Sequence, residues 1–297
     1  MKKVLNKMRE DWILYVMLLP GIVYFVIFHV VPIVGMKLAF QDYRIIGENT
    51  WAGLKHFSIL FSSPAFIDVL KNTVIISTMK IIFIFPIPII LALLINEVRS
   101  GPYRKYVQSV SYLPHFLSWV VIAGIWISFL SPDGGVNILR NFFSLPSLDF
   151  MTSKDHIRWV LVFSEMWRSA GWDSILYIAA IMKISPHLYE AAKLDGANTL
   201  QQMRYITLPA LASTVVTVFI LNLGFFMNAG FDQVFNLMND SVISKVDILD
   251  TYVYRIGLLN GQYAYATAAS LFKGVIGLVL ILSTHFISKR FTGKGVW

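Results

Sequence analysis

Long apolar segments recur along the chain and restrict the folds that it can adopt more than any other feature. The hydrocarbon core of a bilayer is about 30 Å thick, which a helix of about 20 apolar residues crosses. Six segments approach this length, and we expect each to be a membrane-spanning helix: residues 12–34, 73–95, 107–130, 157–182, 211–226 and 264–287. Only 14% of the residues are charged, against about 25% in soluble domains. The sequence therefore predicts an all-α, polytopic membrane protein, with a single transmembrane domain over residues 1–297.

Several classes of functional site are excluded or disfavoured by what the sequence lacks. There are no cysteines, so disulfides, thiol catalysis and cysteine-based zinc sites are excluded. The six histidines show neither i, i+4 spacing nor a His-Glu-x-x-His motif, which disfavours a metal site. The chain also lacks the Gly-rich motif that binds ATP phosphates and the Gly-x-Ser-x-Gly motif of serine hydrolases. We therefore expect no catalytic residue, metal or cofactor in this chain.

The net charge of +8 is explained by membrane topology rather than by nucleic-acid binding. With a cytoplasmic N-terminus, the short cytoplasmic segments carry thirteen basic residues: Lys2, Lys3, Lys7, Arg9, Arg99, Arg104, Lys105, Lys183, Lys193, Arg204, Lys289, Arg290 and Lys294. The longer outer segments carry eight: Arg44, Lys55, Lys71, Arg140, Lys154, Arg158, Lys245 and Arg255. This excess follows the positive-inside rule, so we expect both termini in the cytoplasm. The first apolar run is longer than the roughly 7–15 residues of a signal-peptide core, and we expect it to remain as a span.

A polar stretch, residues 185–209, separates the fourth predicted span from the fifth and has the signals of two short helices. Ser185-Pro186 is typical of a helix start. Asp195-Gly196 is typical of a helix end, because glycine readily adopts the left-handed conformation found there. Residues 199–202 predict a capping box at the start of a second helix, and Pro209 is expected to end or bend that helix.

The same stretch carries a motif with defined spacing. Glu190-Ala191-Ala192 is followed by Asp195-Gly196-Ala197 and then by Ile206-x-Leu208-Pro209, with nine residues between Gly196 and Ile206. This spacing resembles the EAA loop in the permeases of binding-protein-dependent ABC importers. Six spans, a loop between the fourth and fifth, and the lack of an ATP site extend the resemblance to nearly the whole chain.

The resemblance implies a type I ABC importer permease in the plasma membrane of a bacterium, which is a transport subunit and not an enzyme. The loop would be the cytoplasmic coupling helix: Glu190 would pair with a basic group of an ATPase, Ala191 and Ala192 would fit its groove, and Gly196 would permit the turn. The implied partners are a second homologous permease chain, two ATP-binding cassette ATPases that bind ATP and Mg, an extracellular sugar-binding protein and membrane lipid.

Three further segments are similar to sugar permeases, especially those that import complex or polysaccharide-derived oligosaccharides. They are residues 231–238 (FDQVFNLM), 247–253 (DILDTYV) and 265–268 (YATA). The resemblance therefore implies that the transported molecule is a sugar or an oligosaccharide.

Polar groups inside the predicted spans belong either to structural pairs or to the substrate path, because an unpaired charge in hydrocarbon is costly. Both roles stay open for Lys80 and Lys273, whereas Lys37 lies near a span end, where its side chain reaches the interface. Glu165 and Arg168 are spaced to pair on the fourth span. Sugars bind through hydrogen bonds and flat aromatic surfaces, which makes one cation and the outer end of the fifth span the candidate path: Arg168, Asn222, Phe225, Phe226, Asn228 and Phe231.

Two alternatives remain open from the sequence alone. An ion-gradient-driven secondary transporter or channel would need acidic residues at mid-membrane, and the clearest of these, Glu165 and Asp173, lie beside Arg168. A membrane-embedded enzyme would need a catalytic cluster at one interface, and the sequence shows none. Uptake that survives the loss of ATP hydrolysis would favour the first alternative.

Overall fold

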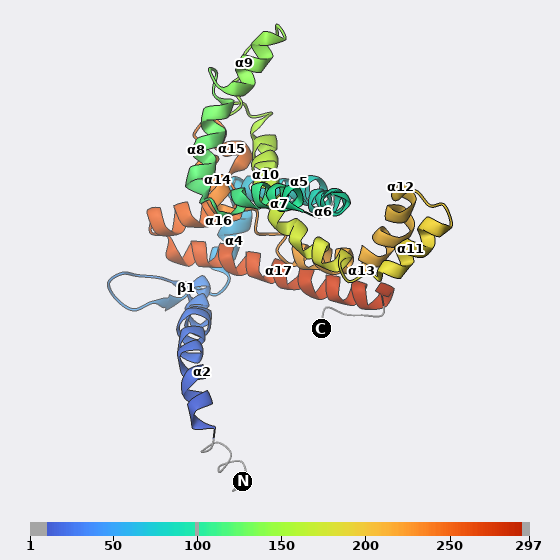
Figure 1. The fold of residues 1–297 in the computed structure, drawn as a ribbon. Helices are drawn as coiled ribbons and strands as arrows, with labels where there is room; N and C mark the ends of the chain where they lie inside the picture. Colours follow the sequence, from blue (N-terminus) through green and yellow to red (C-terminus); the bar gives the residue numbers. More distant parts are fainter. Residues whose placement is uncertain (1–10, 99–100, 293–297) are drawn as a thin grey trace. The chain divides into compact units, whose positions relative to one another are not determined.

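The computed structural model describes residues 11–98 and 101–292, with side chains as far as residue 286. The chain divides into two compact units, which are described separately. Unit 1 comprises Met1–Ser63 and Val253–Phe272, and unit 2 comprises Pro64–Tyr252 and Lys273–Trp297. Figure 1 labels the helices and colours the chain from its N-terminus to its C-terminus. The last helix, α17 (Tyr263–Thr292), contributes residues to both units.

Unit 1 begins with an apolar helical segment that changes its winding three times. Pro32 has no N–H to donate and its ring crowds the preceding turn, and a π-helical turn lies directly before its helix. Beyond this segment, a short hairpin and one helix follow. The elements are α2 (Trp12–Phe25), π-helix η1 (Val26–Val30), α3 (Val31–Gly35), 3-10 helix η2 (Met36–Phe40), β1 (Gln41–Asp42), β2 (Thr50–Trp51), α4 (Lys55–Ser62) and π-helix η5 (Tyr254–Leu259).

Unit 2 consists of helices joined by short turns. Prolines open several of them, because a proline fits the first helical turn, where its missing N–H is not needed. The elements are α5 (Pro64–Ile84), α6 (Pro86–Glu97), α7 (Pro102–Tyr112), 3-10 helix η3 (Leu113–Phe116), α8 (Trp119–Leu130), α9 (Gly135–Phe142), α10 (Ile157–Ile181), α11 (Pro186–Leu194), α12 (Thr199–Gln202), π-helix η4 (Met203–Thr207), α13 (Leu208–Gly224), α14 (Phe231–Leu237), α15 (Ile243–Val246) and α16 (Leu249–Val253).

The other helices of unit 2 pack around α10, which contacts α5, α6, α7, α13, α14 and α15. One cluster of buried apolar side chains, around Leu161, joins α10 to α5, α8 and α14. A second cluster, around Tyr177 and Ile181, joins α10 to α6 and α13. Gly171 permits the close approach of α7, because a Cβ atom there would overlap the Ser111 carbonyl group. These contacts fix α10 as the helix from which the site of unit 2 is built.

Five helical segments are long and apolar enough to cross a membrane: Trp12–Phe40, Pro64–Glu97, Trp119–Phe142, Thr199–Gly224 and Tyr263–Phe286. The remaining predicted span corresponds to α10, which carries Arg158, Glu165, Arg168 and Asp173 and is therefore less apolar. Its 25 residues extend about 37 Å at 1.5 Å per residue, more than the hydrocarbon thickness. Helices thus occupy all six predicted positions.

The structure corrects several predicted boundaries. Residues 107–130 do not form one helix, because α7 ends at Tyr112, η3 contains Pro114, and Ser118 caps α8 by accepting a hydrogen bond from the Val121 N–H. α7 starts at Pro102, five residues before the predicted start of this span. The second predicted span also starts earlier than residue 73, because α5 begins at Pro64, and Phe66 is fully buried in this added part of the helix.

Part of the predicted charge asymmetry lies outside the described residues. This applies to Lys2, Lys3, Lys7, Arg9, Arg99 and Lys294, and to the side chains of Lys289 and Arg290.

Candidate functional site

A cavity of about 840 Å³ lies within unit 2. Its wall is formed by α5, α6, α10 and α13, by Trp119 at the start of α8, and by the corner between α13 and α14, residues 225–230. Small-molecule sites in proteins have volumes of about 300–1,000 Å³. Among the described residues, the charged side chains that line it are Lys80, Glu165, Arg168 and Asp173.

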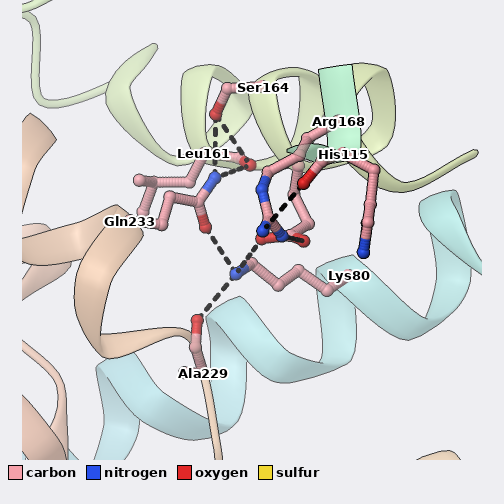
Figure 2. A network of polar contacts seen from close by, with 8 residues as sticks. Lys80, His115, Leu161, Ser164, Arg168, Ala229 and Gln233 are labelled. Carbon is pink, nitrogen blue, oxygen red and sulfur yellow. Dashed lines mark hydrogen bonds and ion pairs between the residues drawn. The ribbon is translucent and has the colours of Figure 1, made fainter. Parts of the chain in front are cut away.

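Lys80 joins α5 to the corner between α13 and α14, as Figure 2 shows. Its Nζ donates hydrogen bonds to the Ala229 carbonyl (2.7 Å) and to Oε1 of Gln233 (2.5 Å). It also lies 3.5 Å from Oε2 of Glu165 on α10. An ammonium group has three N–H donors, so each one has an acceptor. The structural pairing considered for Lys80 is therefore present.

Gln233 extends the same network to α10 (Figure 2). Its side chain is fully buried, and its Nε2 donates to the Leu161 carbonyl (2.6 Å) and to Oγ of Ser164 (2.8 Å). Both ends of the amide are thus bonded, as a buried amide requires. The preceding Gly230 has φ of +97°, which favours glycine, and a Cβ atom at that position would lie 2.9 Å from Nζ of Lys80. The network and the glycine together fix the corner that forms one end of the cavity.

Arg168 is held far less completely than Lys80. Its Nη2 lies 3.5 Å from the His115 carbonyl and its Nη1 lies 4.0 Å from Oε1 of Glu165, while its buried Nε has no hydrogen-bond partner. The guanidinium carbon lies 5.1 Å from the centre of the Trp119 ring, within the range of a cation–π interaction. The predicted pairing of Glu165 with Arg168 is present, although Glu165 lies closer to Lys80.

Aromatic rings supply flat surface on the cavity wall. Trp172 stacks on His115, with ring centroids 4.5 Å apart and planes within 4° of parallel. Phe225 and Phe226 lie on the corner after α13, and the Phe225 side chain is exposed. The wall therefore combines charged groups with aromatic faces, the combination to which sugars bind.

The structure brings together most of the path residues that were predicted from the sequence. Arg168, Asn222, Phe225, Phe226 and Asn228 all line the cavity. Phe231 is not among the lining residues; it lies in α14 and stacks on Phe235. The sequence reasoning missed Gln233, Trp119 and Trp172, since no local pattern distinguishes them from packing residues.

The loop 185–209 forms a second exposed feature of unit 2. Glu190 projects from the nine-residue α11 with an exposed side chain, whose carboxylate lies 3.2 Å from Nδ1 of His187. Gly196 follows the helix with φ of +80°, as predicted for the C-cap position. The capping box of the second helix lies one residue earlier than predicted: it joins Asn198 and Gln201, not Thr199 and Gln202.

The second helix of the loop continues directly into α13. Pro209 therefore does not end the helix; it lies in the first turn of α13, where the winding changes from the π-helix η4 to an α-helix. One side-chain hydrogen bond joins the two helices of the loop, between the hydroxyl groups of Tyr189 and Thr207 (2.9 Å). The same loop exposes large apolar side chains, among them Leu194, Leu200 and Tyr205. Such a surface is typical of an interaction site.

Two other predictions concern cations and metals. Lys273 is paired with Asp250, with Nζ 2.5 Å from Oδ1, so its structural pairing is present. In the described part of the chain, no group of three or more His, Cys, Asp or Glu residues is arranged to hold a metal ion.

Comparison with known proteins identifies relatives over the whole chain. Residues 84–293 match the family described as "Binding-protein-dependent transport system inner membrane component". The polygalacturonan/rhamnogalacturonan transport system permease protein YteP of Bacillus subtilis (strain 168) is 42% identical, over 100% of this chain and 94% of YteP. Protein LplB of the same organism is 40% identical, over 97% of this chain and 92% of LplB.

Solved structures give the same result. A bacterial ABC transporter involved in the import of the acidic polysaccharide alginate contains a chain that is similar with a TM-score of 0.90 and 41% identity, covering 98% of this chain and 99% of that one. A second structure of such a transporter, in complex with an alginate pentasaccharide-bound periplasmic protein, matches equally well. The predicted fold class and the predicted resemblance are confirmed.

Proposed function

The chain belongs to the family of binding-protein-dependent transport system inner membrane components, and we propose that it forms half of the translocation path of an ABC importer for a sugar or oligosaccharide. It is a multi-pass membrane permease subunit and not an enzyme. A second homologous permease chain would complete the path, and two ATP-binding cassette ATPases would bind ATP and Mg. An extracellular binding protein would deliver the sugar, which the periplasmic protein in the alginate complex supports.

The loop 185–209 is the observation that carries this proposal. Its first helix presents an exposed carboxylate, and the loop also exposes several large apolar side chains. We propose that this loop lies in the cytoplasm, as do both termini, and docks on one ATPase. The proposed docking residues are Glu190, Ala191, Ala192, Asp195, Gly196, Ala197, Ile206, Leu208 and Pro209. Because the second helix of the loop continues into α13, closure of the ATPases on ATP would move α13 with the loop.

The cavity is the proposed path for the sugar. Its aromatic faces and polar groups suit a ligand with apolar ring faces and many hydroxyl groups. The proposed contact residues are Arg168, Asn222, Phe225, Phe226 and Asn228, which line the cavity; Phe231, predicted with them, is not among the lining residues. The substrate names of YteP and of the alginate transporter favour an oligosaccharide derived from a polysaccharide. We place the importer in the plasma membrane of a bacterium.

The loop is tested by charge reversal. Glu190→Lys should remove the ATPase from the purified complex and abolish ATP-dependent uptake in liposomes, because it places a cation where the ATPase offers a basic group. The matched control is Glu48→Lys, on the exposed hairpin of unit 1, which should leave both unchanged. Gly196→Asp should abolish uptake without preventing membrane insertion, since φ of +80° is strained for other residues.

Two results would contradict the proposal. Normal uptake by Gly196→Asp would remove the coupling role of the loop. Uptake that continues without ATP hydrolysis and stops when the ion gradient is collapsed would identify a secondary transporter.

A further inference from the structure

We propose that Arg168 makes the cavity selective for acidic sugars, by binding a carboxylate of the sugar. This inference rests on the proposed function, because it assumes that the sugar passes through the cavity. It concerns which of the two cations on the wall meets the sugar, and the structure distinguishes them by their hydrogen bonds.

Lys80 is committed to the protein. Two of its N–H donors make short hydrogen bonds, to the Ala229 carbonyl (2.7 Å) and to Oε1 of Gln233 (2.5 Å), and its charge pairs with Glu165 at 3.5 Å. Arg168 makes no contact shorter than 3.5 Å with its hydrogen-bond and ion-pair partners. A carboxylate that bound Lys80 would have to displace one of these acceptors of Lys80, which lie in the corner (Ala229), in α14 (Gln233) and in α10 (Glu165) (Figure 2). The role of Lys80 is therefore structural, and its charge is not available to bind the sugar.

Arg168 keeps donors free for a ligand. A guanidinium group has five N–H donors in a planar fork that matches the two oxygens of a carboxylate. The two contacts of its Nη atoms, at 3.5 and 4.0 Å, are both at the limit of such interactions. The Trp119 ring, 5.1 Å from the guanidinium carbon, contacts Arg168 without using any N–H donor.

The arrangement of charge in the cavity gives a bound sugar a direction. Glu165 lies nearer to Lys80 than to Arg168, so its charge is shared and neutralises Arg168 only in part. Asp173 lines the same wall five residues further along α10, about 7.5 Å at 1.5 Å per residue. A carboxylate of the sugar is favoured beside Arg168 and disfavoured beside Asp173, where hydroxyl groups of the sugar fit instead.

The test measures discrimination by charge in the complete importer, reconstituted in liposomes with ATP and its binding protein. The probes are tetragalacturonate and its fully methyl-esterified form, which have the same length and linkage but differ in charge. The measured quantity is the ratio of their initial uptake rates. Comparing this ratio between variant and wild type cancels the preference of the binding protein, which is the same in both.

Arg168→Gln should lower the acid-to-ester uptake ratio by about 10- to 100-fold, the usual value of a hydrogen-bonded charge pair. Arg168→Lys should lower it by less, because the charge remains and the planar fork is lost. Lys71→Gln removes the same charge from the exposed part of α5, where Lys71 pairs with Asp68, and should leave the ratio unchanged.

The inference is overturned if Arg168→Gln leaves the acid-to-ester uptake ratio unchanged. If both rates fall by the same factor, the role of Arg168 is structural; if neither rate falls, Arg168 has no role in uptake. If this variant does not assemble, Arg168→Lys decides: an unchanged ratio refutes the role of the guanidinium fork, and a severalfold fall supports it. Failure of the proposed function is a separate result, in which the wild-type complex shows no ATP-dependent uptake of either probe.

Discussion

Lys80 offers the sharpest test of how the cavity is built. Lys80→Met keeps the length of the side chain and removes its charge and its three donors. The Ala229 carbonyl and Oε1 of Gln233 then lose the donor that they share. Of its two cationic partners, Glu165 keeps only Arg168, 4.0 Å away. The exposed fractions of the Lys80 and Glu165 side chains are only 14% and 21%, so water replaces these contacts poorly.

The expected loss follows from these contacts. Removing one partner of a buried ion pair costs about 3–5 kcal/mol, and an orphaned buried acceptor costs about 1–3 kcal/mol. Since Arg168 still compensates Glu165 in part, we expect the free energy of unfolding to fall by about 4 kcal/mol in total. At about 2–4 °C per kcal/mol, as in domains of 150–250 residues, the Tm of the assembled complex should fall by about 8–16 °C.

The assay is thermal unfolding of the complex in lipid nanodiscs, with Lys71→Met as the matched control. Lys71 lies on the same helix, and its exposed ion pair with Asp68 should contribute less than about 1 kcal/mol. The double variant Lys80→Met/Glu165→Gln should recover part of the loss, because the uncompensated charge is gone. Equal Tm values for Lys80→Met and Lys71→Met, or strict additivity in the double variant, would refute the reasoning.

Two further predictions concern single contacts. Tyr189→Phe removes the hydroxyl group that bonds Thr207, and should lower the sugar imported per ATP hydrolysed by about two- to tenfold, the value of one hydrogen bond. Tyr205 is exposed in the same loop, and Tyr205→Phe should not change this ratio. An equal effect of the two variants would show that the Tyr189–Thr207 hydrogen bond has no role in coupling. Gly230→Ala should lower the Tm more than Gly47→Ala, since φ is positive at both, at +97° and +105°, but only Gly230 has a side chain within 3 Å of the new Cβ atom. Indistinguishable Tm values would show that Lys80 moves aside at little cost.

The positions of the helices were predictable because the signal lies in continuous stretches of sequence. α10 was predicted despite its four charged residues, because its length matches the bilayer and apolar residues separate the charges. Pro114 marks the break within residues 107–130, and α7 starts at Pro102, before the predicted start of the span. A proline signals a helix start and a turn equally well, and only packing against α10 decides between them.

The loop 185–209 was also predicted well, for the same reason. Caps depend on residues three or four positions apart, so Pro186 and Gly196 appear where the sequence placed them. The capping box was displaced by one residue because the sequence offers two equivalent pairs, Asn198 with Gln201 and Thr199 with Gln202. The extended backbone at residue 198 selects the first pair.

The network around Lys80 was beyond prediction because its members are distant in sequence. Gln233 lies 153 residues from Lys80, and Trp119 and Arg168 come from different helices. A buried glutamine or an aromatic residue in a membrane helix has the same local pattern whether it packs or binds. Their meeting depends on how α5, α8, α10 and α14 pack, which no local signal encodes.

The two cations of the cavity show why this packing matters for function. From the sequence, Arg168 was a candidate for the substrate path, and both a structural role and a path role stayed open for Lys80. In the structure, Gln233 and the Ala229 carbonyl satisfy Lys80, and Glu165 approaches Lys80 more closely than Arg168. An acceptor that binds Lys80 does not occupy the N–H donors of Arg168, which therefore stay available for the carboxylate of a sugar. The selectivity that we assign to Arg168 therefore depends on residues that need not touch the sugar. Gly230 is one of them, because a Cβ atom there would crowd Nζ of Lys80.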